Sequence, residues 1–78
     1  MKARWAVVLR QGYAGAPHRR GPIIRREGTL TRLGARARAK ALAPRPTPVV
    51  AGLGPMWHVE VLRSADADLL EARVGRRG

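Results

Sequence analysis

The stretch from Trp57 to Arg63 constrains the fold of this chain most, because it alternates strictly between two faces over seven residues. Trp57, Val59 and Val61 share one face, and the residues between them share the other. Such alternation of strand-forming residues is typical of a half-buried β-strand. Residues 5–10 have the same Trp-x-Val opening and the same Leu-Arg ending. We therefore expect both stretches to be strands of one small sheet, with residues 57–63 as its framework.

A first helix is expected between these strands. Thr29 or Thr31 can act as its N-cap, and Pro44 requires it to end at or before residue 43. On a helical wheel, one narrow face consists of small and apolar residues, namely Leu30, Leu33, Gly34, Ala37 and Ala41. We expect this face to pack on the sheet, with Gly34 at the point of close approach.

A second helix is expected over residues 65–75. Ser64 or Asp66 can cap its N-terminus, and Gly75 is placed to end it. Three apolar side chains are expected to pack on the sheet: Leu69, Leu70 and Val74.

Two further short stretches can contribute strands. Ile23–Arg26 can pair antiparallel with residues 5–10, and Val49–Ala51 can form a hairpin with residues 57–63. Without that hairpin, residues 5–10 and 57–63 would lie parallel, joined by a right-handed crossover. We predict one α+β domain over residues 1–78, with two or three strands and two helices in the order strand, helix, optional strand, strand, helix. It includes a flexible basic loop over residues 11–28 and a proline-rich connector over residues 44–55.

The composition limits the size of the core and the chemistry of the chain. Only 17 of the 78 residues are Leu, Ile or Val, so a single thin core is expected. The absence of cysteine excludes disulfides and thiolate metal sites. His18 and His58 are the only histidines, and no arrangement of nucleophile and base is apparent. His58 can pair with Glu60, but a polar row facing solvent on a one-sided sheet is the expected arrangement. We predict no enzymatic activity, no metal and no cofactor.

The charge is strongly positive and unevenly distributed. The net charge is +11, and all of it falls within residues 1–55, because residues 56–78 hold four basic and four acidic residues. Fourteen of the sixteen basic residues are arginines, which bind phosphate bidentately and stack on bases. A general composition bias is another explanation for the high arginine content, since Arg, Ala, Gly and Pro together supply 42 of the 78 residues.

Nucleic acid, DNA or RNA, is therefore the partner we predict, held mostly through sequence-independent phosphate contacts. The residues expected to bind it are Arg19, Arg20, Arg25, Arg26, Arg32, Arg36, Arg38 and Lys40, with Tyr13 and His18 beside them in the basic loop. Trp5 and Trp57 are expected in the core, and would form a stacking platform if they lay on an open face.

The sequence also allows other partners and indicates where the protein is located. The alternative function is a protein-interaction module, for example a small phage-encoded regulator, that docks on an acidic protein or a larger assembly. A homo-oligomer paired through residues 57–63 is a third arrangement. No apolar run approaches the ~18 residues of a membrane span, so we expect a cytoplasmic protein that binds no membrane.

Overall fold

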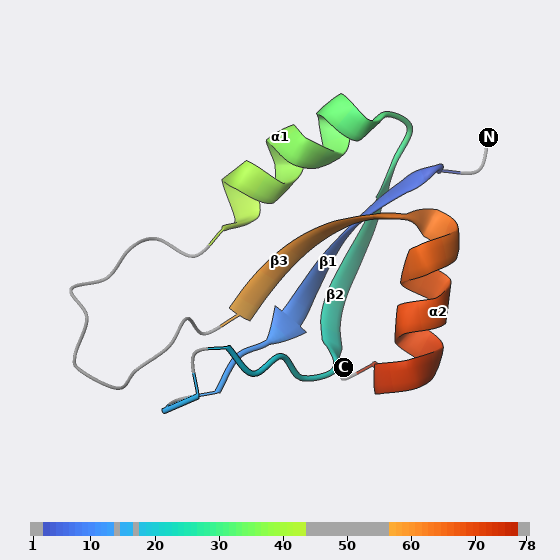
Figure 1. Cartoon of the computed structure of the whole chain (residues 1–78). Helices are drawn as coiled ribbons and strands as arrows, with labels where there is room; N and C mark the ends of the chain where they lie inside the picture. Colours follow the sequence, from blue (N-terminus) through green and yellow to red (C-terminus); the bar gives the residue numbers. More distant parts are fainter. Residues whose placement is uncertain (1–2, 14, 17, 44–56, 77–78) are drawn as a thin grey trace.

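The computed structural model describes residues 3–13, 15–16, 18–43 and 57–76. These residues form three strands and two helices in the order β1 (Trp5–Gln11), β2 (Ile23–Thr29), α1 (Arg32–Leu42), β3 (Trp57–Arg63) and α2 (Ser64–Val74) (Figure 1). The prediction of a small α+β domain with two helices packed on a sheet is confirmed. The predicted connector over 44–55 and the candidate strand Val49–Ala51 lie outside the described residues.

The three strands form one sheet in the order β2-β1-β3, and both neighbouring pairs are antiparallel. At the centre of the sheet, Val7 lies between Glu27 of β2 and Val61 of β3. The central strand is thus β1, whose residues 6–9 are all buried, as their continuous apolar run favours. β3, which we expected to be the framework, is at an edge of the sheet, where one alternating apolar face is sufficient.

The third strand is β2, and it changes two expectations. The suggested antiparallel pairing of Ile23–Arg26 with the first strand is confirmed, but the strand extends to Thr29. The basic loop is correspondingly shorter than the predicted 11–28, because Gln11 belongs to β1 and residues 23–28 belong to β2. The alternative of a parallel first and last strand is wrong, because β2 reverses the chain before α1.

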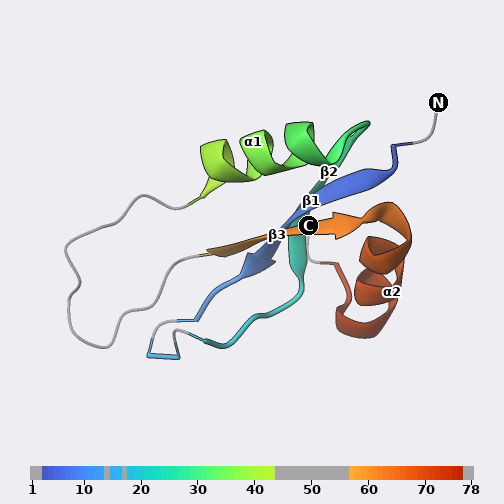
Figure 2. The ribbon, with the colours of Figure 1, turned by 45° about the horizontal axis from the view of Figure 1, so that its top comes forward.

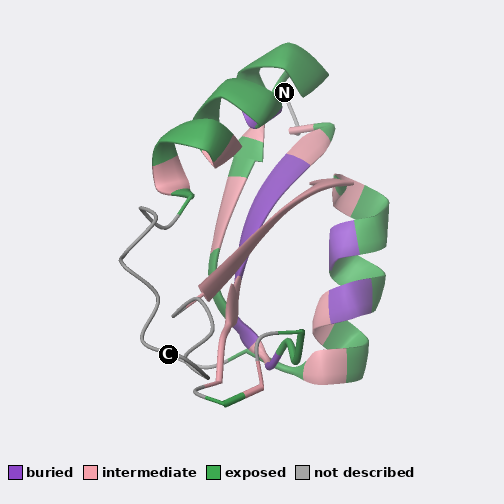
Figure 3. Cartoon of the chain, turned by 60° about the vertical axis from the view of Figure 1, so that its left-hand side comes forward, coloured by how far each residue is buried: buried purple, intermediate pink, exposed green. Residues whose placement is uncertain are grey.

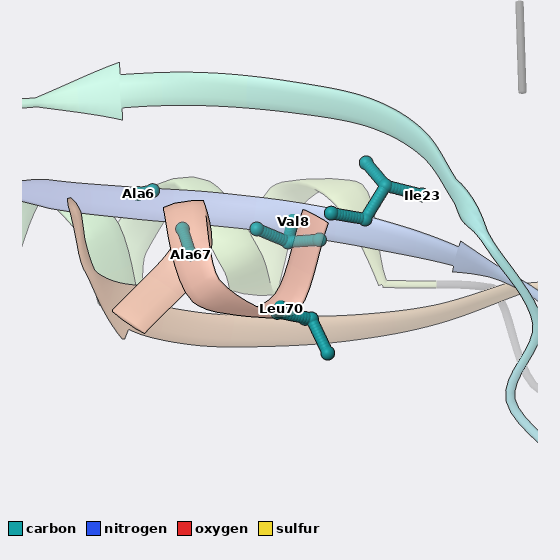
Figure 4. Packing of buried hydrophobic residues seen from close by; sticks show 5 residues of the cluster. All are labelled: Ala6, Val8, Ile23, Ala67 and Leu70. Atoms are coloured by element: carbon teal, nitrogen blue, oxygen red, sulfur yellow. The ribbon is translucent and has the colours of Figure 1, made fainter. Parts of the chain in front are cut away.

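The two helices cover opposite faces of the sheet, α1 on one side and α2 on the other (Figure 2). On the α2 side, the core consists of Ala6, Val8, Ile23, Ala67 and Leu70 (Figure 4). On the α1 side, it consists of Val7, Leu9 and Ala35, with both tryptophans packed against them. The expectation of a one-sided sheet is therefore wrong.

The helix α1 has the predicted limits but buries another face. Thr31 is the N-cap, and its hydroxyl oxygen accepts a hydrogen bond of 3.0 Å from the Gly34 amide. Gly34 is exposed, and the close approach it allows is to Thr31 rather than to the sheet. The residues that pack on the sheet are Ala35, Ala39 and Leu42. Because two alanines contact the sheet, the helix buries little side-chain surface, and its outer side is exposed (Figure 3).

The helix α2 packs fewer of its apolar side chains on the sheet than the sequence predicts. Its N-cap position is Arg63, without a side-chain capping bond, and the Ser64 hydroxyl instead donates to the Ala3 carbonyl at 2.6 Å. Leu70 is buried as predicted and Val74 packs beside it, but Leu69 is 70% exposed. Ala67 takes the expected place of Leu69 against the sheet. Gly75 ends the helix with a φ of 78°, as expected.

Candidate nucleic-acid interface

Arginines in this protein fall into two groups, those that contact a carboxylate and those that do not. The chain has five acidic residues, and four of them, Glu27, Glu60, Asp68 and Glu71, form ion pairs with arginines. An arginine that is hydrogen-bonded to a carboxylate has fewer N–H donors left for a phosphate. The ion pairs therefore indicate which cations are available to a ligand.

Arg26 is the most strongly held of the residues predicted to bind nucleic acid. Its guanidinium donates to Asp68 at 2.7 Å and to Glu71 at 3.0 Å, and also to the Ser64 carbonyl at 3.3 Å. The hydrogen bond to Asp68 is the main reason why the pKa of Arg26 is raised above its usual value. Arg26 thus joins β2 to α2, and we assign it to the fold rather than to the binding surface.

Glu27 joins the same strand to α1 on the other face of the sheet. Its carboxylate accepts hydrogen bonds from Arg38 at 3.1 and 3.2 Å, in a fork-like arrangement, and lies 3.6 Å from Arg25. The hydrogen bond from Arg38 is the main reason why the pKa of Glu27 is lowered. Arg38 is therefore hydrogen-bonded to a carboxylate, whereas Arg25 contacts the same carboxylate without a hydrogen bond.

Glu60 connects β3 to the basic loop. It forms an ion pair with Arg20 and lies 3.7 Å from Arg10. The suggested pair between His58 and Glu60 does not form, and the Nε2 atom of His58 is buried without a hydrogen-bond partner among the described residues. The row of polar residues on this face of β3 is thus largely covered, contrary to expectation.

The basic loop is hydrogen-bonded to itself and to β1. The amide of Gly21 donates to the Gln11 carbonyl at 2.8 Å, and Arg10 Nε donates to the Gly21 carbonyl at 2.9 Å. Gly21 is buried, and a Cβ there would clash with the Tyr13 hydroxyl. The guanidinium of Arg19 lies over the Tyr13 ring, 4.6 Å from its centroid. Among the described residues of the basic loop, Arg19 forms no ion pair with a carboxylate, and His18 is exposed beside it.

The other end of the sheet carries a denser group of available cations. Here Trp5 is surrounded by Arg4, Arg32, Arg36 and Arg63, a group that we call the Trp5 patch. The guanidinium carbons of Arg32 and Arg63 lie 5.7 and 5.5 Å from the centroid of the Trp5 ring. In the described part of the chain, none of the four arginines forms an ion pair with a carboxylate.

Trp5 separates two shallow hollows on this surface. One, of about 510 Å³, is lined by Trp5, Arg32, Arg36 and Val61. The other, of about 190 Å³, is lined by Arg4, Trp5 and Arg63. The indole is half-buried and forms part of the wall of both hollows.

The antiparallel sheet assembles the Trp5 patch from distant parts of the sequence. Trp5 begins β1 and Arg63 ends β3, and the two residues are partners in the sheet register. Partner residues in a sheet point to the same face, which here is the face covered by α1. Arg32 and Arg36 lie in the first turns of α1, which begins at the same end of the molecule (Figure 1).

The structure therefore divides the predicted binding residues into three groups. Tyr13, His18, Arg19 and Arg20 lie at the loop end, whereas Arg32 and Arg36 lie at the Trp5 end. β1 has seven residues between these ends, which corresponds to about 20 Å. Arg25, Arg26 and Arg38 contact carboxylates in between, and Lys40 is exposed in the last turn of α1.

Arg4 and Arg63 were missed at the sequence level. Arg63 belongs to the part of the chain that is neutral overall, so the charge distribution gave no reason to select it. The register between the first and last strands is the signal that brings it to Trp5. This register depends on β2, of which the sequence predicts only the short stretch Ile23–Arg26.

Two kinds of feature are absent from the residues that the structure describes. No group of three or more His, Asp or Glu side chains is placed to hold a metal ion. None of the described helices is both long and apolar enough to cross a bilayer. Comparisons with protein-family models, with curated proteins and with solved structures find no match.

Proposed function

We propose that this protein is a small, non-enzymatic nucleic-acid-binding protein that holds phosphates mainly through the Trp5 patch. The observation that supports this most is the grouping of four arginines without carboxylate partners around one accessible indole. The clustered cations repel one another on a chain of net charge +11, and binding of a polyanion relieves this repulsion. The planar guanidinium also matches the geometry of a phosphate.

Within the predicted set of binding residues, the Trp5 end is the main contact surface. Lys40 continues the row of cations along α1 from Arg32 and Arg36, so that five cations are available on this side of the molecule. The loop residues Arg19, His18 and Tyr13 are left as a secondary contact at the far end of the sheet. The arginines of the Trp5 patch are expected to contact mainly phosphates, so binding should be largely independent of sequence.

The salt dependence of binding tests the proposal. If five cations contact phosphates, the logarithm of the association constant falls against the logarithm of salt concentration with a slope of roughly −3 to −5, depending on whether the ligand is single- or double-stranded. Fluorescence anisotropy of labelled random DNA and RNA, between about 50 and 200 mM salt, measures this slope. A lack of binding to any of these ligands at the lowest salt concentration would refute the proposal.

A pair of charge-matched variants locates the surface. Arg36→Gln removes a cation of the Trp5 patch, whereas Arg73→Gln removes an exposed cation from α2 on the opposite face. We expect R36Q to reduce the magnitude of the salt slope by about one, and R73Q to leave it unchanged. Equal effects of the two substitutions would indicate that net charge, rather than the Trp5 patch, determines binding.

One observation favours a protein partner instead. Leu30 and Leu33 are 58% and 80% exposed beside Arg32 and Arg36. Exposed leucines among cations suit an acidic protein surface with an apolar centre, and phosphate binding does not need them. The substitution Leu33→Gln separates the two functions, because it should leave nucleic-acid affinity unchanged. A partner protein that is retained after nuclease treatment and lost with L33Q would favour the interaction module.

A further inference from the structure

We infer that the Trp5 patch binds an unpaired base, so that its ligand is a single-stranded polynucleotide rather than a duplex. This inference depends on the proposed function, and it specifies the class of nucleic acid. It is carried by the position of Trp5 between the two hollows and by the row of cations that leads away from it along α1.

Two guanidiniums approach the Trp5 ring, and the indole also packs against the core beneath α1. The guanidiniums of Arg32 and Arg63 lie 5.7 and 5.5 Å from the ring centroid, close to the limit of about 6 Å for a cation–π contact. Each such exposed contact corresponds to roughly a two- to fivefold factor in an equilibrium constant, whereas stacking of a base on an aromatic side chain corresponds to roughly 5- to 150-fold. A base is therefore expected to displace the guanidiniums, which then become free to bind its phosphates.

The cations of α1 provide a path for the backbone. Arg32, Arg36 and Lys40 are all exposed and follow one another at intervals of four residues. An α-helix rises about 6 Å over four residues, which is similar to the length of one nucleotide in an extended strand. The row starts at the larger hollow, where Trp5, Arg32 and Arg36 form the lining. A strand with one base on Trp5 can thus place its next phosphates along this row.

A duplex cannot use the same site fully. Its bases are already stacked on both faces, so it offers phosphates but no ring for Trp5. Stacking on Trp5 involves the face of a base and not its edge, and every base has such a face. The site is therefore expected to select for unpaired bases without selecting strongly among them.

Four labelled ligands of equal length test this inference by fluorescence anisotropy: oligo-dT, oligo-rU, a DNA duplex, and an abasic strand with the same phosphates but no bases. We expect oligo-dT or oligo-rU to bind at least about fivefold more tightly than the duplex or the abasic strand. The ratio of the dT and rU affinities then shows whether DNA or RNA is preferred.

The variants Trp5→Leu and Trp57→Leu connect the effect to one indole. W5L should weaken the binding of oligo-dT and oligo-rU at least fivefold and leave the abasic strand within about twofold. Trp57 is on the same face but at the other end of β1, and its indole donates to the Leu42 carbonyl at 2.8 Å. W57L should therefore leave the preference for base-containing strands intact. W5F, which keeps an aromatic ring, should retain part of the preference, and circular dichroism checks that each variant is folded.

The results distinguish this inference from the proposed function. If none of the four ligands binds at about 50 mM salt, the proposed function fails. If the abasic strand and the duplex bind as tightly as oligo-dT and oligo-rU, or if a folded W5L weakens all four ligands equally, the protein binds phosphates but the inference of a base on Trp5 is overturned.

Discussion

Arg26 lies where β2 faces α2, and its guanidinium contacts two carboxylates and a backbone carbonyl. Arg25, the preceding residue, points to the other face, is more exposed, and lies 3.6 Å from its carboxylate partner. The two side chains have the same charge and adjacent positions. They therefore offer a matched test of whether hydrogen-bonded arginines stabilise this fold.

We predict that Arg26→Gln lowers the free energy of unfolding by about 1 kcal/mol. Hydrogen bonds to charged groups contribute roughly 1.5–3 kcal/mol, but Asp68 is largely exposed and solvent screening reduces the effect. Urea unfolding followed by circular dichroism measures it. Arg25→Gln is the control and should leave the unfolding midpoint nearly unchanged. If both variants are equally stable, Arg26 does not act as a clamp.

At the scale of single residues, the sequence predicts which residue types bind phosphate but not which copies are available. Arg26 and Arg36 are equivalent in sequence, since both are arginines in the basic part of the chain. The carboxylates that hold Arg26 are 42 and 45 residues away. Their position depends on how α2 packs on the sheet, which no local pattern specifies.

Elements are held together in this protein by carboxylates as well as by apolar contacts. Glu27 connects β2 to α1 through Arg38, and this hydrogen bond lowers the pKa of Glu27 in the folded state. A carboxyl group with a lowered pKa stabilises the fold above its unfolded pKa, and this contribution is lost as the pH falls through the folded pKa.

We therefore predict that the fold loses stability as the pH decreases below about 4.5, the usual pKa of this group. Thermal unfolding between pH 6 and pH 3 measures the loss. Glu27→Gln is less stable than the wild type at pH 6, and its melting temperature should decrease less over the same range. Parallel pH profiles for the two proteins would contradict a role for Glu27 in joining β2 to α1.

The buried face of α1 gives a second prediction at the scale of elements. Ala35 is fully buried between the helix and the sheet, whereas Leu33 is 80% exposed. Ala35→Leu adds volume to a filled space and should cost about 1–3 kcal/mol of stability. Leu33→Ser, on the outer side, should leave the stability nearly unchanged. Thermal unfolding of both variants decides which face of α1 packs, and the opposite result would restore the face predicted from the helical wheel.

The limits of α1 were predictable from sequence, because a Thr N-cap and a following proline act locally. The buried face of α1 was not predictable, because two sets of small residues suit a close contact with the sheet. One set is at positions 34, 37 and 41, and the other is at positions 35 and 39. The leucines at 30 and 33 favoured the wrong choice. They lie before and in the first turn of α1, and both are exposed.

The whole molecule combines a thin core with an uneven charge distribution. Eight hydrophobic residues are buried in the described chain, and the sheet is only three strands wide. The paired carboxylates neutralise cations on both faces of the sheet and along α2, so that the Trp5 end retains its charge. The sequence predicted the fold class and the positive charge. It did not predict where the charge is concentrated, because that depends on the order and direction of the strands.

A marginal fold with a concentrated cationic site should be stabilised strongly by its ligand. A ligand that binds only the folded state adds about 2.7 kcal/mol at a concentration of 100 times its Kd. For a domain of this size, 1 kcal/mol corresponds to about 4–8 °C in Tm. We therefore predict that saturating oligo-dT or oligo-rU raises the Tm by roughly 10–20 °C, as measured by circular dichroism.

Salt distinguishes this stabilisation from a general effect of the buffer. Without ligand, added salt screens the repulsion among cations, so the Tm should rise or stay constant. With oligonucleotide, the same salt weakens binding, and the gain in Tm should shrink. The double variant Arg32→Gln/Arg36→Gln should show a smaller gain at the same ligand concentration, whereas R73Q should match the wild type. A Tm that does not respond to oligonucleotide would mean that the folded state has no preferential affinity for it.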